Sequence, residues 1–231
     1  MAASMPLATS PFTALRASGR LIVSNAVLPL TSYSTICRAS RPAATFPNLR
    51  IPVLDLDGTL IDSDEALLQP FLDLGVPRDK VTFGLLLEEE CALLGIDVQD
   101  YLDRYDTDLA QPYPGVEELV AALDRWAIFS NKEPRSGHAE LARLGWEPTV
   151  ARFSDHETGP KELAPVLHAL GVEPADIVVV GDTDHDRRAA AALSAPFALA
   201  GWNPRVKPLS GEAVLSQPAD VLDLLVASPG A

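Results

Sequence analysis

The sequence is poor in cysteine and in positive charge, and it lacks a long apolar run. Two cysteines, Cys37 and Cys91, make no disulfide framework, which favours a reducing interior over secretion. The formal net charge of −14 argues against a nucleic-acid partner, because phosphate backbones are bound by lysine and arginine. Since no stretch of about 18 apolar residues is present, we expect no membrane span and a soluble, cytoplasmic protein.

The first 50 residues lack aspartate and glutamate, although they contain five arginines and much serine, threonine and alanine. Such an N-terminus is typical of a transit peptide for a plastid or a mitochondrion. The alternatives are an unstructured extension or a translation start placed too early. A secretory signal is disfavoured, because Ser24, Asn25 and Pro29 interrupt the apolar run 21–30. In every case residues 1–50 lie outside the predicted fold, and residues 51–231 hold 13 bases against 32 acids, a balance of −19.

From residue 51 onward, short apolar runs alternate with longer helical stretches, which predicts a Rossmann-like α/β fold with a parallel sheet of about five strands. Apolar residues make up 47% of the chain, enough for a buried core. The predicted strands are Ile51–Leu56, Trp126–Ser130, Val150–Phe153, Ile177–Val180 and Phe197–Ala200. The predicted helices are Val116–Asp124, Arg135–Leu144, Glu162–Leu170, Asp184–Leu193 and Ala219–Val226, with Gly145 and Gly171 as left-handed caps.

One insertion, from residue 63 to about residue 112, interrupts the alternation after the first strand. Its apolar residues have helical spacing, and Gly75 and Gly95 stop two of the runs. We therefore expect a small helical cap over the mouth of the sheet, inserted into a core formed by the rest of residues 51–231. The predicted cap helices are Glu65–Leu74, Lys80–Leu94 and Val98–Tyr105.

Polar residues gather where the predicted strands end, which is the edge where ligands bind in open parallel sheets. Each group has a simpler interpretation. Asp57-Gly58 could be a plain turn, Ser130 and Asn131 could cap a helix, Asp182 and Asp186 could be favourable charges at a helix N-terminus, and Lys161 could be exposed. Lys161 is the hardest to dismiss, since a cation in the first turn of a helix opposes its dipole. Together, and in this order, the groups predict one site.

Four converging carboxylates, those of Asp55, Asp57, Asp182 and Asp186, would repel one another and therefore need a cation. Their hard oxygen ligands suit Mg²⁺, which is also bound by substrate phosphate. Lys161 can supply further positive charge to a phosphate group. Donors for the transferring oxygens can come from Ser130, Asn131 and the backbone amides of the 55–59 loop, with Gly58 and Thr59. Asp55 and Asp57 share one face of an extended strand, so one can attack phosphorus while the other handles the leaving-group proton.

These residues resemble the haloacid dehalogenase superfamily. Asp55-x-Asp57-Gly58-Thr59 is similar to its first motif, Ser130-Asn131-Lys132 to the second, Lys161 to the third and Gly181-Asp182-Thr183-x-x-Asp186 to the fourth. Tyr113-Pro114-Gly115-Val116 resembles a stretch of phosphoglycolate-phosphatase-like members. The sequence departs at Ser194-Ala195, where Ala-Gly is usual, and its cap looks short.

The resemblance implies a role for each matching residue. Asp55 would be the nucleophile and a Mg²⁺ ligand, and Asp57 the general acid and base, touching the metal through its backbone carbonyl. Ser130 would bind the phosphoryl group, and Lys161 would steady Asp55 and the phosphate. Asp182 would hold Mg²⁺, with Asp186 beside it.

The expected function is a Mg²⁺-dependent phosphatase acting on a small phosphorylated metabolite through an aspartyl-phosphate, with phosphoglycolate as a first guess from the resemblance. A metal-free dehalogenase is disfavoured, because such relatives typically lack the second aspartate of the first motif, and Asp57 is present. A phosphomutase of the same superfamily is chemically close and differs in the cap. A non-catalytic, phospho-ligand-binding relative would be expected to lose a nucleophile or a metal ligand, and none is missing.

Overall fold

The structure is a computed structural model, and it describes residues 50–82, 85–154 and 161–225. All of these residues belong to one compact unit, residues 44–231. The segment interpreted as a transit peptide lies outside the described residues, apart from Arg50. In the described part of the chain, no helix is long and apolar enough to cross a membrane.

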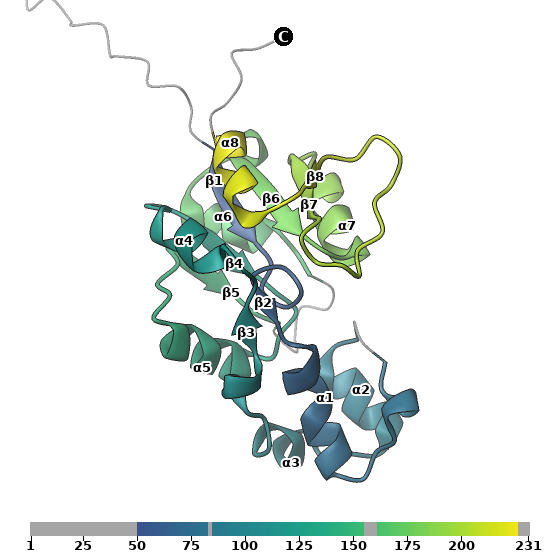
Figure 1. Cartoon of the computed structure of the whole chain (residues 1–231). Coiled ribbons are helices and arrows are strands. Elements are labelled where there is room, and N and C mark those ends of the chain that lie inside the picture. Colours follow the sequence, from purple (N-terminus) through teal and green to yellow (C-terminus); the bar gives the residue numbers. More distant parts are fainter. Residues whose placement is uncertain (1–49, 83–84, 155–160, 226–231) are drawn as a thin grey trace, which may run out of the picture. The chain divides into compact units, whose positions relative to one another are not determined.

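A parallel sheet of six strands forms the centre of this unit (Figure 1). Its strands in chain order are β1 (Ile51–Leu54), β4 (Ala127–Phe129), β5 (Val150–Arg152), β6 (Ile177–Gly181), β7 (Phe197–Ala200) and β8 (Val214–Leu215). In space the order is β5-β4-β1-β6-β7-β8. Because the chain runs outward from β1 to β5 and then returns to the other side of β1, the strand order reverses beside β1. Ligand sites in open parallel sheets lie at this reversal.

The strands of the sheet centre are buried on both faces, which explains their continuous apolar sequences. β1 pairs in parallel register with β4 and with β6, and Val53 lies opposite Ala127 and Val179. Successive residues point to opposite faces, so Val53 joins one buried cluster and Leu54 the other. The five predicted strands are confirmed. The short β8 was not predicted, because a two-residue strand is too short to show a period.

Helices cover both faces of the sheet and give three layers. The cluster that contains Leu54 also receives residues of α4 (Val116–Ala121), α5 (Pro134–Leu144) and α8 (Val221–Leu225). The cluster that contains Val53 receives residues of α6 (Ala164–Leu170) and α7 (Asp184–Ala192). The predicted α/β fold is therefore confirmed.

The predicted glycine caps of two of these helices are also confirmed. Gly145 and Gly171 both adopt the left-handed conformation, each with φ of 67°, just past the ends of α5 and α6. The short 3₁₀ helices of the core are η3 (Pro174–Asp176) and η4 (Pro218–Asp220).

A helical insertion, the cap, leaves the core through a short antiparallel ladder. β2 (Ile61–Asp62) pairs with β3 (Gln111–Pro112), so the outgoing and returning chains lie side by side. Between them lie α1 (Asp64–Asp73), η1 (Arg78–Lys80), α2 (Leu87–Leu94), α3 (Val98–Leu102) and η2 (Thr107–Leu109) (Figure 1). A separate apolar cluster built on Phe71, Val76, Cys91 and Tyr101 holds the cap together.

The predicted cap helix Lys80–Leu94 is wrong over its first half. The chain forms only the turn η1 and enters α2 at Leu87. The backbone N–H of Thr82 donates to Oε1 of Glu90 at 2.7 Å instead of to a carbonyl one turn earlier.

Candidate active site

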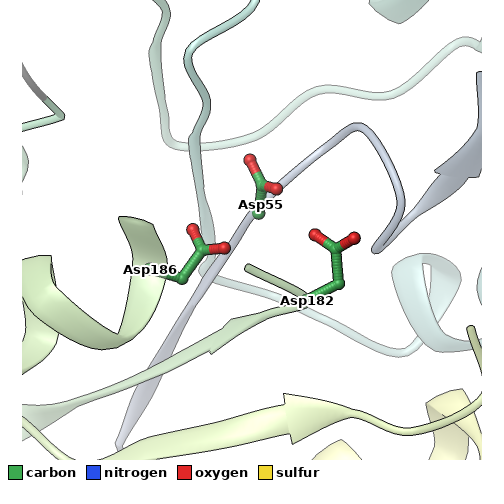
Figure 2. Close-up of side chains that lie close together, drawn as sticks. All are labelled: Asp55, Asp182 and Asp186. Atoms are coloured by element: carbon green, nitrogen blue, oxygen red, sulfur yellow. The ribbon is translucent and has the colours of Figure 1, made fainter. Parts of the chain in front are cut away.

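Three carboxylates meet at the carboxyl ends of β1 and β6. Asp55 directly follows β1, Asp182 directly follows β6, and Asp186 lies in the first turn of α7. Each offers an oxygen within 4.8 Å of the others, and Figure 2 shows the three side chains lying close together. The expectation that strand ends bring these distant residues together therefore holds for the three of them.

Lys161 is the cation of this cluster. Its Nζ lies 2.7 Å from Oδ1 of Asp55 and 2.5 Å from Oδ1 of Asp186. The ammonium also lies 4.8 Å from the ring centroid of Phe129. The sequence argument that placed Lys161 in the first turn of a helix is wrong, because α6 begins three residues later at Ala164. The two carboxylates, and not a helix terminus, account for its position.

The cluster holds more negative charge than Lys161 balances. Burial, with repulsion from Asp186 and Asp182, raises the pKa of Asp55 well above its ordinary value despite the attraction of Lys161. Burial and repulsion from Asp186 raise the pKa of Asp182 to about 7. The pKa of Lys161 is raised by its two carboxylate partners, against the effect of burial. Hard oxygen donors with excess negative charge suit a divalent metal ion, which the three carboxylates could hold.

Asp57 takes part in a different interaction. Asp57 does not belong to the group formed by Asp55, Asp182 and Asp186. Its Oδ1 accepts a hydrogen bond of 2.8 Å from Nζ of Lys132. Lys132 also lies 3.2 Å from Oε1 of Glu140 and donates toward the hydroxyl of Tyr105 at 2.8 Å. The hydroxyl of Tyr105 in turn donates to Glu140. Asp57 is thus held by a buried group of core and cap residues.

The pKa values of Lys132 and Glu140 are both shifted by this arrangement. Lys132 sits between two carboxylates, which raises its pKa, so it remains charged. Burial raises the pKa of Glu140 to about 7, although Lys132 opposes this shift. Glu140 has no solvent exposure, and its Oε2 has no hydrogen-bond partner among the described residues. One cation therefore serves two carboxylates, and burial makes Glu140 bind a proton more readily than an exposed glutamate does.

The turn after β1 packs directly against Asp182. Gly58 has φ of 79°, and a Cβ at this position would lie 2.2 Å from Oδ2 of Asp182. The hydroxyl of Thr59 faces Oδ1 of Asp182 at 3.4 Å. Glycine is required here for two reasons, its left-handed backbone and the close approach of the carboxylate.

Two residues from the segment after β7 fix this turn. Nδ2 of Asn203 donates to the carbonyl of Gly58 at 2.8 Å and approaches Oδ2 of Asp182 at 3.1 Å. Nε1 of Trp202 donates to the carbonyl of Thr59 at 2.8 Å. Asn203 is buried and links the first and fourth motifs.

Asp186 is fixed on its other side by the start of α7. Its Oδ2 accepts from the backbone N–H of Thr183 at 3.0 Å and from the hydroxyl of Thr183 at 2.6 Å. A Cβ on Gly181 would lie 2.3 Å from Cγ of Asp186, so glycine leaves the space that this side chain occupies. Asp186 does lie in the first turn of a helix, where its charge is favourable, and the same residue also faces Lys161.

Ser130 and Asn131 lie at the end of β4 and line the same cavity as the aspartates. Neither caps α5, whose N-cap is Glu133, with its carboxylate accepting from the backbone N–H groups of Arg135 and Ser136. The backbone N–H of Lys132 donates to Oγ of Ser130 at 3.2 Å. Both side chains are therefore placed as the phosphate-binding prediction requires, and that role stays a prediction.

The structure thus brings the predicted residues into one cavity of about 300 Å³, lined by Asp55, Asp57, Gly58, Ser130, Asn131, Lys161 and Asp182 among others. Thr59 and Asp186 each contact a residue of the cavity wall. The hydroxyl of Thr59 faces Asp182, and Asp186 accepts a hydrogen bond from Lys161. Sequence reasoning missed Asn203, Glu140 and Tyr105. Asn203 could have been found, because it follows the end of a predicted strand as the other site residues do. Glu140 and Tyr105 carried no signal, since Glu140 lies inside a predicted helix and Tyr105 at the end of another.

Comparisons with known proteins agree with this geometry. Residues 50–193, more than half of the chain, match the family described as haloacid dehalogenase-like hydrolase. A phosphoglycolate phosphatase of Xylella fastidiosa is 29% identical over 190 residues, covering 68% of this chain and 82% of that protein. An N-acetylmuramic acid 6-phosphate phosphatase of Pseudomonas aeruginosa is 27% identical over 214 residues, covering 77% and 95%.

A solved structure shares the fold. The crystal structure of a putative phosphoglycolate phosphatase from Lactobacillus plantarum superimposes with a TM-score of 0.62 at 22% identity, covering 76% of this chain and 99% of that one. At this identity the likeness establishes the architecture alone. The family match together with the ordered motifs settles the classification that the sequence predicted: this chain belongs to the haloacid dehalogenase-like hydrolases.

Proposed function

We propose that this protein is a Mg²⁺-dependent phosphatase that hydrolyses a small phosphomonoester through a covalent aspartyl-phosphate on Asp55. The observation that carries the proposal is the position of Asp55 in the cavity, between the cation Lys161 and the carboxylate of Asp182. The relatives named above are phosphatases of two different phosphomonoesters, which supports the reaction class and leaves the substrate open.

In the first half-reaction, an oxygen of Asp55 forms a bond to phosphorus while the bond from phosphorus to the leaving oxygen breaks. Lys161 already binds Oδ1 of Asp55 at 2.7 Å, so it fixes the rotamer of the nucleophile and can neutralise charge on the phosphoryl oxygens. Asp57 gives its proton to the leaving oxygen. Since Lys132 occupies Oδ1 of Asp57, we place the exchanged proton on Oδ2.

In the second half-reaction, the carboxylate of Asp57 takes a proton from water, and the resulting oxygen attacks phosphorus. The bond between phosphorus and Asp55 breaks, which releases phosphate and restores both aspartates. Ser130, Asn131 and the backbone amides near Gly58 and Thr59 are the donors available to the phosphoryl oxygens. Positioning and charge neutralisation of this kind are what phosphoryl transfer mainly requires.

The carboxylates of Asp55 and Asp182, with Asp186 beside them and the backbone carbonyl of Asp57, are the groups that would hold Mg²⁺. The donor set fits the ion, because all of these atoms are oxygens and the buried carboxylates carry more negative charge than Lys161 offsets. When bound, Mg²⁺ would neutralise charge on the phosphoryl group and orient it for in-line attack.

The test is phosphate release from p-nitrophenyl phosphate and from a panel of small phosphorylated metabolites, with the full chain and Mg²⁺. Chelation should abolish turnover, and Ca²⁺ should support it poorly, because its larger and looser shell suits in-line geometry less well. Acid-quenched enzyme should carry a phosphoryl group on Asp55, and Asp55→Asn should carry none. Full activity in excess chelator would show that turnover needs no metal ion, and the proposed Mg²⁺ dependence would be wrong. Isomerisation of a sugar phosphate without phosphate release would favour a phosphomutase instead.

A further inference from the structure

The cavity above the site has two chemically different parts. The part formed by strand ends carries the charged groups, including Asp55, Asp57 and Lys161. The part formed by the cap is mostly apolar and is lined by Leu67, Phe71, Val81, Leu87 and Tyr101. A volume of about 300 Å³ is at the small end of ligand sites. The leaving group of a bound phosphomonoester would therefore rest against an apolar surface of the cap.

Two cap carboxylates line the cavity; Asp64 pairs with Arg205, and Glu90 lies within the apolar surface. Glu90 lies in α2, is 4% exposed and lines the cavity. Its Oε1 accepts a hydrogen bond from the backbone N–H of Thr82 at 2.7 Å. Its Oε2 has no hydrogen-bond partner among the described residues. A buried acceptor without a partner is costly, so its presence beside a cavity indicates a donor that arrives with a ligand.

The cations that line the cavity are already paired. Lys161 lies between Asp55 and Asp186, and Lys132 lies between Asp57 and Glu140. Arg205 pairs with Asp64 and lies 3.7 Å from Asp62. Within the described residues, every lysine or arginine of the cavity wall thus has a carboxylate partner. A second anionic group on the substrate would meet Glu90 and an apolar wall.

We propose, on the basis of the phosphatase function proposed above, that the substrate is a phosphomonoester whose leaving group carries no second anion. Its leaving group has an apolar face that packs on the cap and a hydroxyl or amino group that donates to Oε2 of Glu90. This class excludes phosphoglycolate, the first guess from the family resemblance, because its carboxylate would lie near Glu90 without a free cation.

Three synthetic esters isolate the distal group of the substrate. They are meta-(hydroxymethyl)benzyl phosphate, meta-methylbenzyl phosphate and meta-carboxybenzyl phosphate, which share a benzyl leaving oxygen and differ only in the distal substituent. The full chain with Mg²⁺ should turn over the hydroxymethyl ester with a kcat/KM about 10- to 100-fold above the methyl ester, the factor expected for a hydrogen bond to a charged group. The carboxy ester should be the slowest, and phosphoglycolate should be slow as well.

Glu90→Gln removes the charge and keeps an oxygen for the backbone N–H of Thr82. In this variant the preference for the hydroxymethyl over the carboxy ester should fall about tenfold or more, while the melting temperature changes little. Glu89→Gln is the matched control, because Glu89 is exposed on the same helix and does not line the cavity. This control should keep the wild-type preference.

The outcomes separate the two proposals. If wild type hydrolyses p-nitrophenyl phosphate but prefers phosphoglycolate or the carboxy ester, the substrate class is wrong and the phosphatase proposal stands. A preference for the hydroxymethyl ester that Glu90→Gln leaves unchanged also overturns the assignment to Glu90. If no phosphomonoester, p-nitrophenyl phosphate included, is hydrolysed with Mg²⁺, the phosphatase proposal itself fails and the substrate class fails with it.

Discussion

Lys132 holds Asp57 through a hydrogen bond of 2.8 Å from its Nζ to Oδ1 of the carboxylate. The same Nζ lies 3.2 Å from Oε1 of Glu140, a residue of α5 with no solvent exposure. The hydroxyl of Tyr105, a cap residue, completes the group by contacting both Lys132 and Glu140. The proposed acid and base of the reaction is therefore oriented by a buried network that extends from the core into the cap.

Glu140 should make folding stability depend on pH. Its pKa is raised to about 7 in the folded protein from an ordinary value of 4.5, mainly by burial. The folded chain therefore binds this proton more tightly than the unfolded chain, and the contribution of Glu140 to the free energy of unfolding falls as pH rises from about 4.5 to about 7. The loss amounts to roughly 3 kcal/mol, since one pKa unit corresponds to about 1.4 kcal/mol.

The measurement is urea unfolding of wild type and Glu140→Gln between about pH 5 and about pH 8. Because glutamine does not titrate, wild type should lose stability relative to the variant as pH rises. Exposed Glu147, just past the end of α5, provides the control variant Glu147→Gln, which should track wild type at every pH. A constant difference between wild type and Glu140→Gln across this range would show that Glu140 does not titrate there.

Asp55 and Asp57 should fail in different ways when each is replaced by asparagine. Asp55→Asn removes the proposed nucleophile, so neither an alkyl phosphate nor p-nitrophenyl phosphate should be hydrolysed. Asp57→Asn keeps the nucleophile and loses the proton donor, a contribution of about 10²–10⁴-fold. Its loss should be much smaller with p-nitrophenyl phosphate, whose leaving group needs no proton. Equal losses on both substrates would reject the division of roles.

The sequence predicted the fold and the charged residues of the site because both depend on local patterns. Buried parallel strands read as apolar runs, and the residues that follow them meet at one edge of the sheet, as Asp55 and Asp182 do. Lys161 does lie beside the aspartates, but the helix argument for it was wrong, since its position depends on two carboxylates far away in the sequence. The Lys132–Glu140 ion pair could not be predicted from the sequence, because it forms only when α5 packs against the core.

The cap was harder to predict than the core. Its helices were expected from apolar spacing. α1 lies within one residue of its predicted bounds, and α3 begins at Val98 as predicted but ends at Leu102 instead of Tyr105. The segment before α2 is different, because Glu90 binds the backbone of Thr82 and diverts the chain from a helix. A side chain that bonds a backbone group eight residues away leaves no periodic signal, so the shape of the cap wall, on which the proposed substrate class rests, could not be predicted from the sequence.

Asn203 should support the metal site without touching the substrate. It donates to the carbonyl of Gly58 and approaches Oδ2 of Asp182, so it orients one proposed ligand. Asn203→Leu should raise the Mg²⁺ concentration for half-maximal activity about 10- to 100-fold, the usual effect of losing a residue that orients a metal ligand. Trp202→Phe is the control, because Trp202 bonds the carbonyl of Thr59 in the same turn and not Asp182. A Mg²⁺ requirement that is unchanged in Asn203→Leu would contradict this role.

Gly58→Ala should damage the site by a clash with Asp182 and not by backbone strain alone. Gly58 has φ of 79°, and the added Cβ would lie 2.2 Å from Oδ2 of Asp182. Gly171 has φ of 67° at the end of α6, with nothing within 4 Å of an added Cβ. Both substitutions carry the cost of placing alanine in a left-handed conformation, about 1 kcal/mol. Only Gly58→Ala must also displace a proposed metal ligand.

A comparison of Gly58→Ala with Gly171→Ala therefore separates the effect of backbone strain from the effect of the clash with Asp182. Both variants should lower the melting temperature, and Gly171→Ala should keep its kcat and its Mg²⁺ dependence. Gly58→Ala should lose at least tenfold in kcat/KM with p-nitrophenyl phosphate and require more Mg²⁺, since Asp182 can no longer occupy its place beside Asp55. If Gly58→Ala kept wild-type kinetics at wild-type Mg²⁺ concentrations, Asp182 would not need its observed position, and its assignment as a metal ligand would have to be withdrawn.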